Sequence, residues 1–284
     1  MNKESEKSGN SQLLYVPGGQ LAYDFSGRGV PVIFIHAAIA DRRMWNREME
    51  VFGENHQVVR FDMRGYGGSQ HASGPFSCVE DIRELIKQLK LQRPFLAGCS
   101  MGGGFAINYA VEYPDEISGL LLAAPGLPGT PQEAFTSEEL SAFEYDWKKS
   151  TEISNKWSEG RKSEALDLLR QLWCSALKGK NMELFMRMAE ENAEEVFTEQ
   201  SMQLVEEKNP AYNRLDSIRA PTTVMVGDCD NPSSIPFANL ISRGITGSKL
   251  VHVPGADHLI NLSQPDVFEA ELRTALERAT GPRR

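Results

Sequence analysis

The sequence lacks an apolar run of the roughly 18 residues that a membrane-spanning helix needs. Its first twelve residues are polar and contain no apolar core of a secretion signal. Positive charge is in deficit, because 30 Lys and Arg residues face 39 Asp and Glu residues, for a net charge of −9. An acidic chain repels phosphate backbones and anionic lipid headgroups, so neither nucleic acid nor a membrane is expected as a partner.

Cysteine is scarce and scattered, since Cys78, Cys99, Cys174 and Cys229 show no C-x-x-C spacing. In a chain of 284 residues this pattern is typical of free or buried thiols, so a reducing cytoplasm is the expected location. No Cys and His spacing predicts a metal site. The stretch 65–70 lacks the last glycine of G-x-G-x-x-G, and no Walker spacing is present, so no cofactor is expected.

Apolar material is sufficient for a core, because 40% of the residues are hydrophobic and 24% are charged, which excludes a disordered chain. Short apolar runs bounded by turn residues predict strands that are covered on both faces, as in a parallel sheet. These runs are Val32–Ile35, Val58–Phe61, Phe95–Ala97, Leu120–Ala123, Thr223–Val226 and Leu250–Val253, and a hairpin of Leu13–Val16 with Leu21–Phe25 precedes them.

Helical patterns alternate with the apolar runs. Ser77 and Glu80 form a capping box ahead of an apolar stripe within residues 79–89. A second pattern starting at 106 stops at Pro114, and Pro265 opens a last helix. This alternation predicts the α/β class, with a mostly parallel, doubly wound sheet.

Residues 129–213 break the alternation, because they contain helical patterns, many aromatic and Met residues and no convincing strand. We therefore expect a helical cap at 129–213, inserted in a core of residues 13–128 and 214–284 that follows a flexible tail at 1–12. The apolar side chains of the cap would form a small core, line an apolar substrate pocket, or do both. The acidic run Glu190–Glu195 is expected to be a solvated helix face.

The most informative segment is Gly98-Cys99-Ser100-Met101-Gly102, which is G-x-S-x-G between an expected strand and an expected helix. A sharp strand-to-helix turn forces the serine into a strained conformation, and the flanking glycines avoid steric clashes. The turn presents the Ser100 hydroxyl at a helix N-terminus, where free N–H groups stabilise a developing oxyanion. Cys99 is an alternative nucleophile, through its thiol. It lies one residue before Ser100, the apex of the turn, so its side chain is expected to point into the protein.

A nucleophilic serine needs a base and an orienting acid. His258 follows the last expected strand, so it lies at the same carboxyl edge of the sheet as Ser100. His252 falls inside an apolar strand and is expected to be a packing or hydrogen-bonded histidine, while His56 and His71 fall in polar loops and are expected to be surface residues. The loop after Thr223–Val226 offers two acids, and Asp230 is preferred to Asp228 because it is further from the strand end.

The chain order of Ser100, Asp230 and His258 is that of α/β-hydrolases. The sequence resembles the lidded, single-domain esterases, lactonases and perhydrolases of that fold from about Val16 to Ala279. The matching motifs are 34–38, 62–69, the Ser100 turn, Gly227-x-x-Asp230 and 255–258. The resemblance implies a helical cap within 129–213 and structural roles for His36 and Arg64, which brace neighbouring loops.

The resemblance also implies an oxyanion hole. Its donors are the backbone N–H groups of Met101 and of Ala38, with Ala37 as the alternative to Ala38. Ala37 departs from the family, which usually has glycine there, and would be strained if that position needed a positive φ. Ala37, Trp147 and Trp173 are further expected to contact substrate.

The expected function is a serine hydrolase that cleaves a small to medium apolar carboxylic ester or lactone through an acyl-enzyme. A carbon–carbon bond hydrolase and a cofactor-free perhydrolase would use the same triad, so both remain open. A non-hydrolytic small-molecule-binding protein and a scaffold protein are the alternatives outside catalysis.

Overall fold

The computed structural model describes residues 11–197, 204 and 210–281. In these residues an eight-stranded sheet has the order β1-β2-β4-β3-β5-β6-β7-β8. The strands are β1 (Gln12–Val16), β2 (Gly19–Ser26), β3 (Val30–Ile35), β4 (His56–Phe61), β5 (Phe95–Cys99), β6 (Gly119–Ala123), β7 (Thr222–Gly227) and β8 (Lys249–Val253). The β1–β2 and β2–β4 pairings are antiparallel and the others are parallel, so the predicted α/β class and mostly parallel sheet are confirmed.

Helices alternate with the strands as predicted. They are α1 (Asn46–Gly53), α2 (Cys78–Gln88), α3 (Met101–Glu112), α4 (Ser137–Ser158), α5 (Lys162–Trp173), α6 (Gly179–Glu191), α7 (Ala193–Phe197), α8 (Ser234–Gly244), α9 (Ile260–Ser263) and α10 (Pro265–Thr280), with the 3-10 turns η1 (Arg42–Trp45), η2 (Gln132–Ala134) and η4 (Ala211–Ser217). Ser77 caps α2 by accepting the Glu80 N–H at 3.4 Å, α3 ends before Pro114, and Pro265 opens α10. Of the expected tail, only Ser11 and Gln12 fall within the described residues, and Gln12 begins β1.

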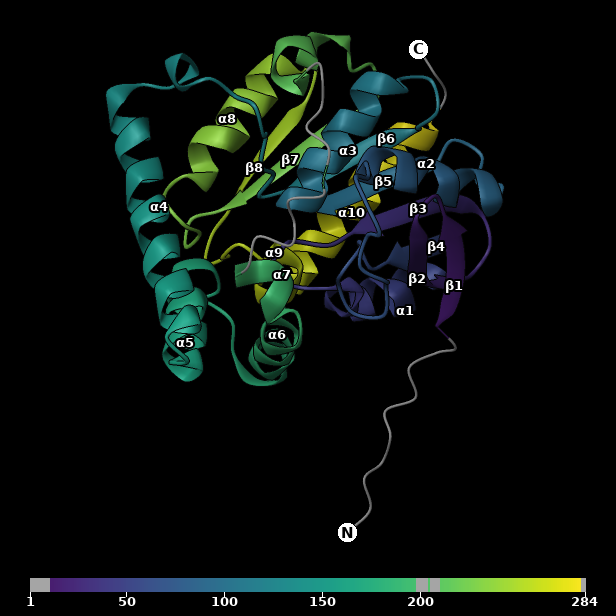
Figure 1. Ribbon diagram of the computed structural model, residues 1–284. Helices are drawn as coiled ribbons and strands as arrows, with labels where there is room; N and C mark the ends of the chain where they lie inside the picture. The colour runs from purple at the N-terminus through teal and green to yellow at the C-terminus, as the bar shows by residue number, and fades with distance from the viewer. Residues whose placement is uncertain (1–10, 198–203, 205–209, 282–284) are drawn as a thin grey trace.

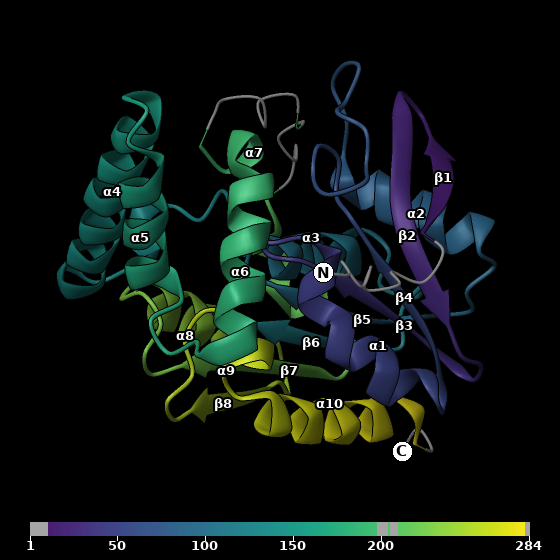
Figure 2. The same cartoon turned by 90° about the horizontal axis from the view of Figure 1, so that it is seen from below.

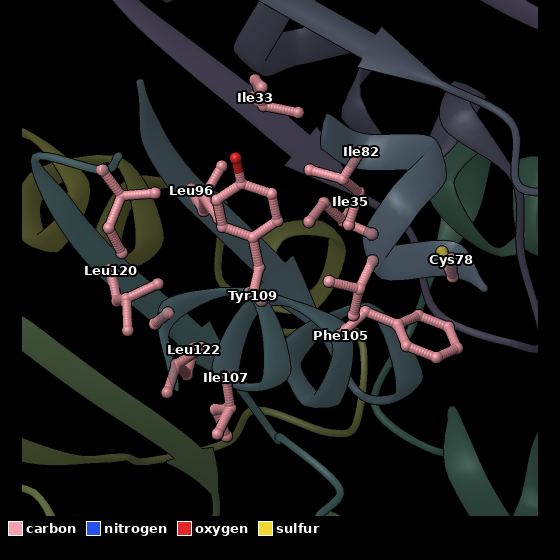
Figure 3. Close-up of a cluster of buried hydrophobic side chains, with 14 of the residues drawn as sticks. Ile33, Ile35, Cys78, Ile82, Leu96, Phe105, Ile107, Tyr109, Leu120 and Leu122 are labelled. Atoms are coloured by element: carbon pink, nitrogen blue, oxygen red, sulfur yellow. The ribbon is translucent and has the colours of Figure 1, made fainter. Parts of the chain in front are cut away.

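Alternate side chains of the central strands enter two cores, one on each face of the sheet. Ile33 and Leu96 join the core under α2, α3 and α8, while Val32 and Phe34 join the core under α1 and α10. Figure 3 shows part of the first core, with the Tyr109 ring of α3 pointing toward strands β5 and β3. Because these strands are buried on both faces, their sequences are apolar throughout.

Strand β8 departs from the expected pattern, because it is the last strand of the sheet and has one unpaired edge within the described residues. His252 is exposed there, so the prediction of a packing histidine is wrong. The apolar run at 250–253 predicts a strand that is buried on both faces, but most side chains of this edge strand are only partly buried.

Helices α4 and α5 lie at the side of the molecule opposite the β1–β2 hairpin, and α6 and α7 lie between them and the hairpin (Figures 1 and 2). Their buried side chains, including Leu169 and Phe185, are continuous with the core under α1 and α10. None of the helices in the described ranges combines the length and apolar character needed to cross a membrane. The division of the chain into core and cap stays a prediction.

Helix α1 carries a buried carboxyl, Glu48, which is 0% exposed. Its Oε2 accepts a hydrogen bond from Asn261 Nδ2 at 3.4 Å, but its Oε1 has no partner among the described residues. Burial raises the pKa of Glu48 to about 8 from an ordinary value of 4.5. Glu48 is therefore protonated in the folded protein at neutral pH.

The Glu48→Gln substitution is expected to stabilise the protein at alkaline pH. Between pH 4.5 and about 8 the unfolded chain releases a proton that the folded chain keeps, so the free energy of unfolding falls as pH rises through this window. Gln carries no charge and loses this penalty, which is on the order of a few kcal/mol near pH 8. Thermal unfolding of both proteins should show a gap that widens from about pH 5 to about pH 8.5.

Glu50→Gln is the matched control, because Glu50 lies exposed on the same helix. It should leave the unfolding midpoint and its pH dependence unchanged. A gap between wild type and Glu48→Gln that does not vary with pH would contradict a raised pKa for Glu48.

Candidate active site

The loops that carry the predicted site residues all leave the carboxyl ends of parallel strands. Ala38 follows β3, Ser100 follows β5, Asp230 follows β7 and His258 follows β8. Because parallel strands end at a common edge, this topology gathers four distant segments at one side of the sheet. Such an edge is where open α/β sheets bind their ligands.

Ser100 occupies the sharp turn between β5 and α3 and has φ 54° and ψ −117°. This is a positive φ in a residue other than glycine, which is uncommon and costs energy. The Ser100 N–H donates to the Ala123 carbonyl at 2.9 Å, and its own carbonyl accepts from Gly104 N–H and Gly126 N–H at 3.0 and 3.1 Å. These bonds hold the strained turn, and the expected strain is confirmed.

The glycines that flank the turn are required by close backbone contacts. A Cβ on Gly98 would lie 2.4 Å from the Gly102 carbonyl oxygen. A Cβ on Gly102 would lie 2.4 Å from the Ile35 carbonyl oxygen, so the absence of a side chain lets α3 pack directly on the end of β3. The steric reason predicted for these glycines is therefore confirmed.

The predicted oxyanion donors, Ala38 and Met101, follow β3 and begin α3, the two elements that meet at Gly102. Met101 begins α3, so its N–H is one of the free donors of a helix N-terminus, and both Met101 and Ala38 are partly exposed. Ala37 is 0% exposed and its N–H donates to Met44 Sδ at 3.5 Å. Among the described residues, Ala37 is not one of the non-glycine residues with positive φ, so alanine is not strained there.

The structure brings His258 and Asp230 together. His258 Nδ1 lies 2.9 Å from Asp230 Oδ1 and 3.1 Å from Oδ2, and the two side chains are 4% and 0% exposed. Asp228, the alternative acid, instead accepts the Gly255 N–H at 2.6 Å. The pairing at Nδ1 directs the other ring nitrogen, Nε2, away from Asp230 and leaves it free to act as a base.

Among the residues expected to contact substrate, Trp173 lies against the histidine. Its ring meets the His258 ring edge-on with centroids 4.5 Å apart. Trp147 on α4 is 76% exposed, and Ala37 is fully buried. Neither residue has a described contact with the acid–base pair, and substrate contact stays a prediction for all three.

His36 and Arg64 brace neighbouring loops, as the resemblance implies. His36 Nε2 accepts the Met63 N–H at 2.9 Å, so the proton is on Nδ1, which lies 2.8 Å from the Ala37 carbonyl oxygen. Burial lowers the pKa of His36 and keeps the ring neutral. Arg64 makes two bonds of 2.7 Å with the Asp81 carboxylate and donates to the Pro17 carbonyl oxygen at 2.7 Å.

Cys99 is fully buried, and its Sγ lies 3.5 Å from the His258 carbonyl oxygen. Burial raises the pKa of the thiol well above its ordinary value, so the thiol stays protonated and is a poor nucleophile. The expectation that this side chain points into the protein is confirmed.

The acidic run Glu190–Glu195 is not a fully solvated face, which corrects the sequence interpretation. Asn192 is 3% exposed and joins two loops of the sheet, because its Nδ2 donates to Asp41 Oδ2 and its Oδ1 accepts the Gly67 N–H, both at 2.8 Å. Glu195 is 9% exposed and pairs with the imidazole of His71 at 2.8 Å. These polar side chains are buried against partners that are distant in the sequence. The local composition of the run does not indicate such partners.

Among the described residues, no three His, Cys, Asp or Glu side chains are arranged to hold a metal ion. The chemistry available at this sheet edge is that of an imidazole oriented by a carboxylate, with a serine in the strained turn that follows another strand of the same edge.

Comparison with known proteins identifies the family profile described as "Alpha/beta hydrolase family", which matches residues 32–271. The monoacylglycerol lipase ABHD6 of Rattus norvegicus is 26% identical over 272 residues, covering 89% of this chain and 79% of its own. A thermophilic esterase from Thermogutta terrifontis superposes with a TM-score of 0.74 at 25% identity, covering 95% of this chain and 99% of its own. An enzyme that degrades N-acyl homoserine lactones shares the fold, with a TM-score of 0.71 at 23% identity and coverage of 93% and 99%.

Proposed function

The chain belongs to the alpha/beta hydrolase family, and from this membership and the geometry of its loops we propose that it is a serine hydrolase of carboxylic esters. The observation that carries the proposal is the contact of His258 Nδ1 with Asp230 at 2.9 Å, at the sheet edge where the strained turn presents Ser100. An imidazole oriented in this way is the base that a serine nucleophile requires.

In the proposed reaction, Ser100 Oγ attacks the ester carbonyl carbon while His258 Nε2 accepts the hydroxyl proton. Asp230 holds the imidazole by Nδ1 and stabilises the imidazolium. The carbonyl oxygen becomes an oxyanion that the N–H groups of Met101 and Ala38 receive, and each such donor typically contributes about 10² to 10³ in rate. His258 then protonates the leaving alcohol, and a water molecule deprotonated by His258 releases the acid and restores Ser100.

The burial of Ala37 supports Ala38 as the second donor. The Ala37 N–H is directed at Met44 Sδ, whereas Ala38 is partly exposed next to it. Two donors from separate segments, one after β3 and one at the start of α3, are the usual form of an oxyanion hole in this fold.

The proposed substrate is a small to medium apolar ester or lactone bound under a cap formed by residues 129–213. This region carries partly exposed apolar surface, because Phe135 and Phe143 cluster with Phe237 of α8 at centroid distances of up to 5.4 Å. Aromatic surfaces of this kind favour apolar acyl or alkyl groups. The names of the rat lipase and the Thermogutta esterase agree with ester substrates. The proposal includes the expected cytoplasmic location and no cofactor.

A panel of p-nitrophenyl acetate, butyrate and octanoate, a γ-lactone and a vinylogous 1,5-diketone tests this function. We expect hydrolysis of at least one ester or lactone, with kcat/KM rising from acetate to butyrate because the chain gains apolar contact. Cleavage of the diketone alone would replace the ester proposal by carbon–carbon bond hydrolysis. Binding of the panel without turnover would replace it by a small-molecule-binding role.

A further inference from the structure

The helical segment, which comprises α4 to α7 and the turns between them, contacts both of the loops that carry the acid–base pair. On the acid side, Asp146 of α4 is 7% exposed and its Oδ2 accepts the Ser233 N–H at 3.1 Å. Ser233 is the N-cap of α8 and makes no capping bond with its own side chain. Asp146 therefore supplies, from a distant part of the chain, a hydrogen-bond acceptor at the N-terminus of α8.

A continuous set of hydrogen bonds leads from this cap to Asp230. Asn231 Oδ1 accepts the Ser233 hydroxyl at 3.0 Å, and it also accepts the N–H and hydroxyl of Ser234 at 3.2 and 3.0 Å. The Asn231 N–H donates to Asp230 Oδ1 at 2.7 Å. Hydrogen bonds within the turn thus connect Asp230 to Ser233, and Asp146 holds the Ser233 end of the turn.

The histidine loop is held from the same helical segment. The His258 N–H donates to the Trp173 carbonyl oxygen at 3.1 Å, at the end of α5. Asp257 Oδ2 accepts the N–H groups of Ala176 and Leu177 at 3.0 and 3.1 Å. Both partners of the pair therefore take their position in part from residues outside the sheet.

We propose that Asp146 is a positioning residue that fixes Asp230 against His258 by anchoring the turn at the start of α8. This inference rests on the proposed function, because it assigns a role in the same acid–base pair. In this proposal the helical segment positions the acid–base pair in addition to covering the substrate.

We expect the positioning role of Asp146 to depend on its hydrogen bond to Ser233, because its negative charge is costly where it lies. Its Oδ1 is buried and has no partner among the described residues, which is costly for a carboxylate. Burial, with a smaller contribution from the charge of Asp230, raises the pKa of Asp146. An asparagine would keep the acceptor for Ser233 and remove this cost.

The test compares Asp146→Ala, Asp146→Asn and Glu144→Ala, using p-nitrophenyl butyrate as the probe. Loss of the anchor in Asp146→Ala should lower kcat by about tenfold to a hundredfold with KM changed less than about twofold, since the turn shifts but the substrate pocket does not. Asp146→Asn should stay within about twofold of wild type in kcat. Glu144 lies exposed on the same helix, so Glu144→Ala should match wild type. Unchanged kcat in Asp146→Ala, or equal losses in both Asp146 variants, would overturn the proposal.

A second measurement reads the acid–base pair without any substrate and separates this inference from the proposed function. The proton shared by His258 Nδ1 and Asp230 gives a far-downfield NMR resonance, identified by its loss in His258→Ala. We expect it to shift or broaden in Asp146→Ala and to stay in place in Asp146→Asn, whether or not the protein hydrolyses esters. A resonance that is unmoved in Asp146→Ala would refute the positioning role even if the esterase proposal stands.

Discussion

Replacing Ser100 by Ala is expected to lower kcat for a carboxylic ester by about 10⁵- to 10⁶-fold. The change removes the only atom that forms the proposed acyl-enzyme, so what remains is the stabilisation of a water attack by the oxyanion hole. The backbone bonds that hold the turn at φ 54° do not involve the side chain, so the fold should persist.

The measurement is steady-state hydrolysis of the best ester of the panel, with thermal unfolding of both proteins as the control for folding. Unfolding midpoints within a few degrees of each other would show that the turn survives the change. A Ser100→Ala variant that keeps more than about one hundredth of the wild-type kcat would mean that another group is the nucleophile.

Replacing Asp230 by Asn is expected to lower kcat by about 10⁴-fold. Asparagine keeps the shape of the side chain, but its amide can donate to His258 Nδ1 and so favours the tautomer with the proton on Nε2. That tautomer cannot accept the serine proton, and the imidazolium also loses its counter-charge.

Asp228→Asn is the matched control, because Asp228 lies two residues away in the same loop and contacts the Gly255 N–H. Its amide oxygen can still accept that bond, so activity should stay within about threefold of wild type. A larger loss in Asp228→Asn than in Asp230→Asn would reassign the acid of the triad to Asp228.

The sheet could be predicted because its central strands are buried on both faces, which gives them a distinctive composition. Runs such as Val32–Ile35 fall within strands of the structure, and turn residues bounded them closely. Local signals were weaker where burial is partial. The exposed His252 of β8 illustrates this.

The part of the candidate site that depends on chain order and sheet topology could be predicted from the sequence. Strand ends at one edge of a parallel sheet bring Ser100, Asp230 and His258 to that edge with no further information. The support for these residues could not be predicted in the same way. Asp146 and Ser233 are 87 residues apart, and Asn192 lies 125 residues from Gly67. Such contacts depend on how the helical segment packs against the sheet, and no local pattern encodes that packing.

Intact mass after incubation with a fluorophosphonate, on wild type and on Ser100→Ala, tests the central claim most directly. An activated serine attacks phosphorus and displaces fluoride, so wild type should gain the mass of one phosphonyl group per chain and Ser100→Ala should gain none. An adduct that persists in Ser100→Ala, or no adduct on folded wild type, would contradict the assignment of Ser100 as the activated nucleophile.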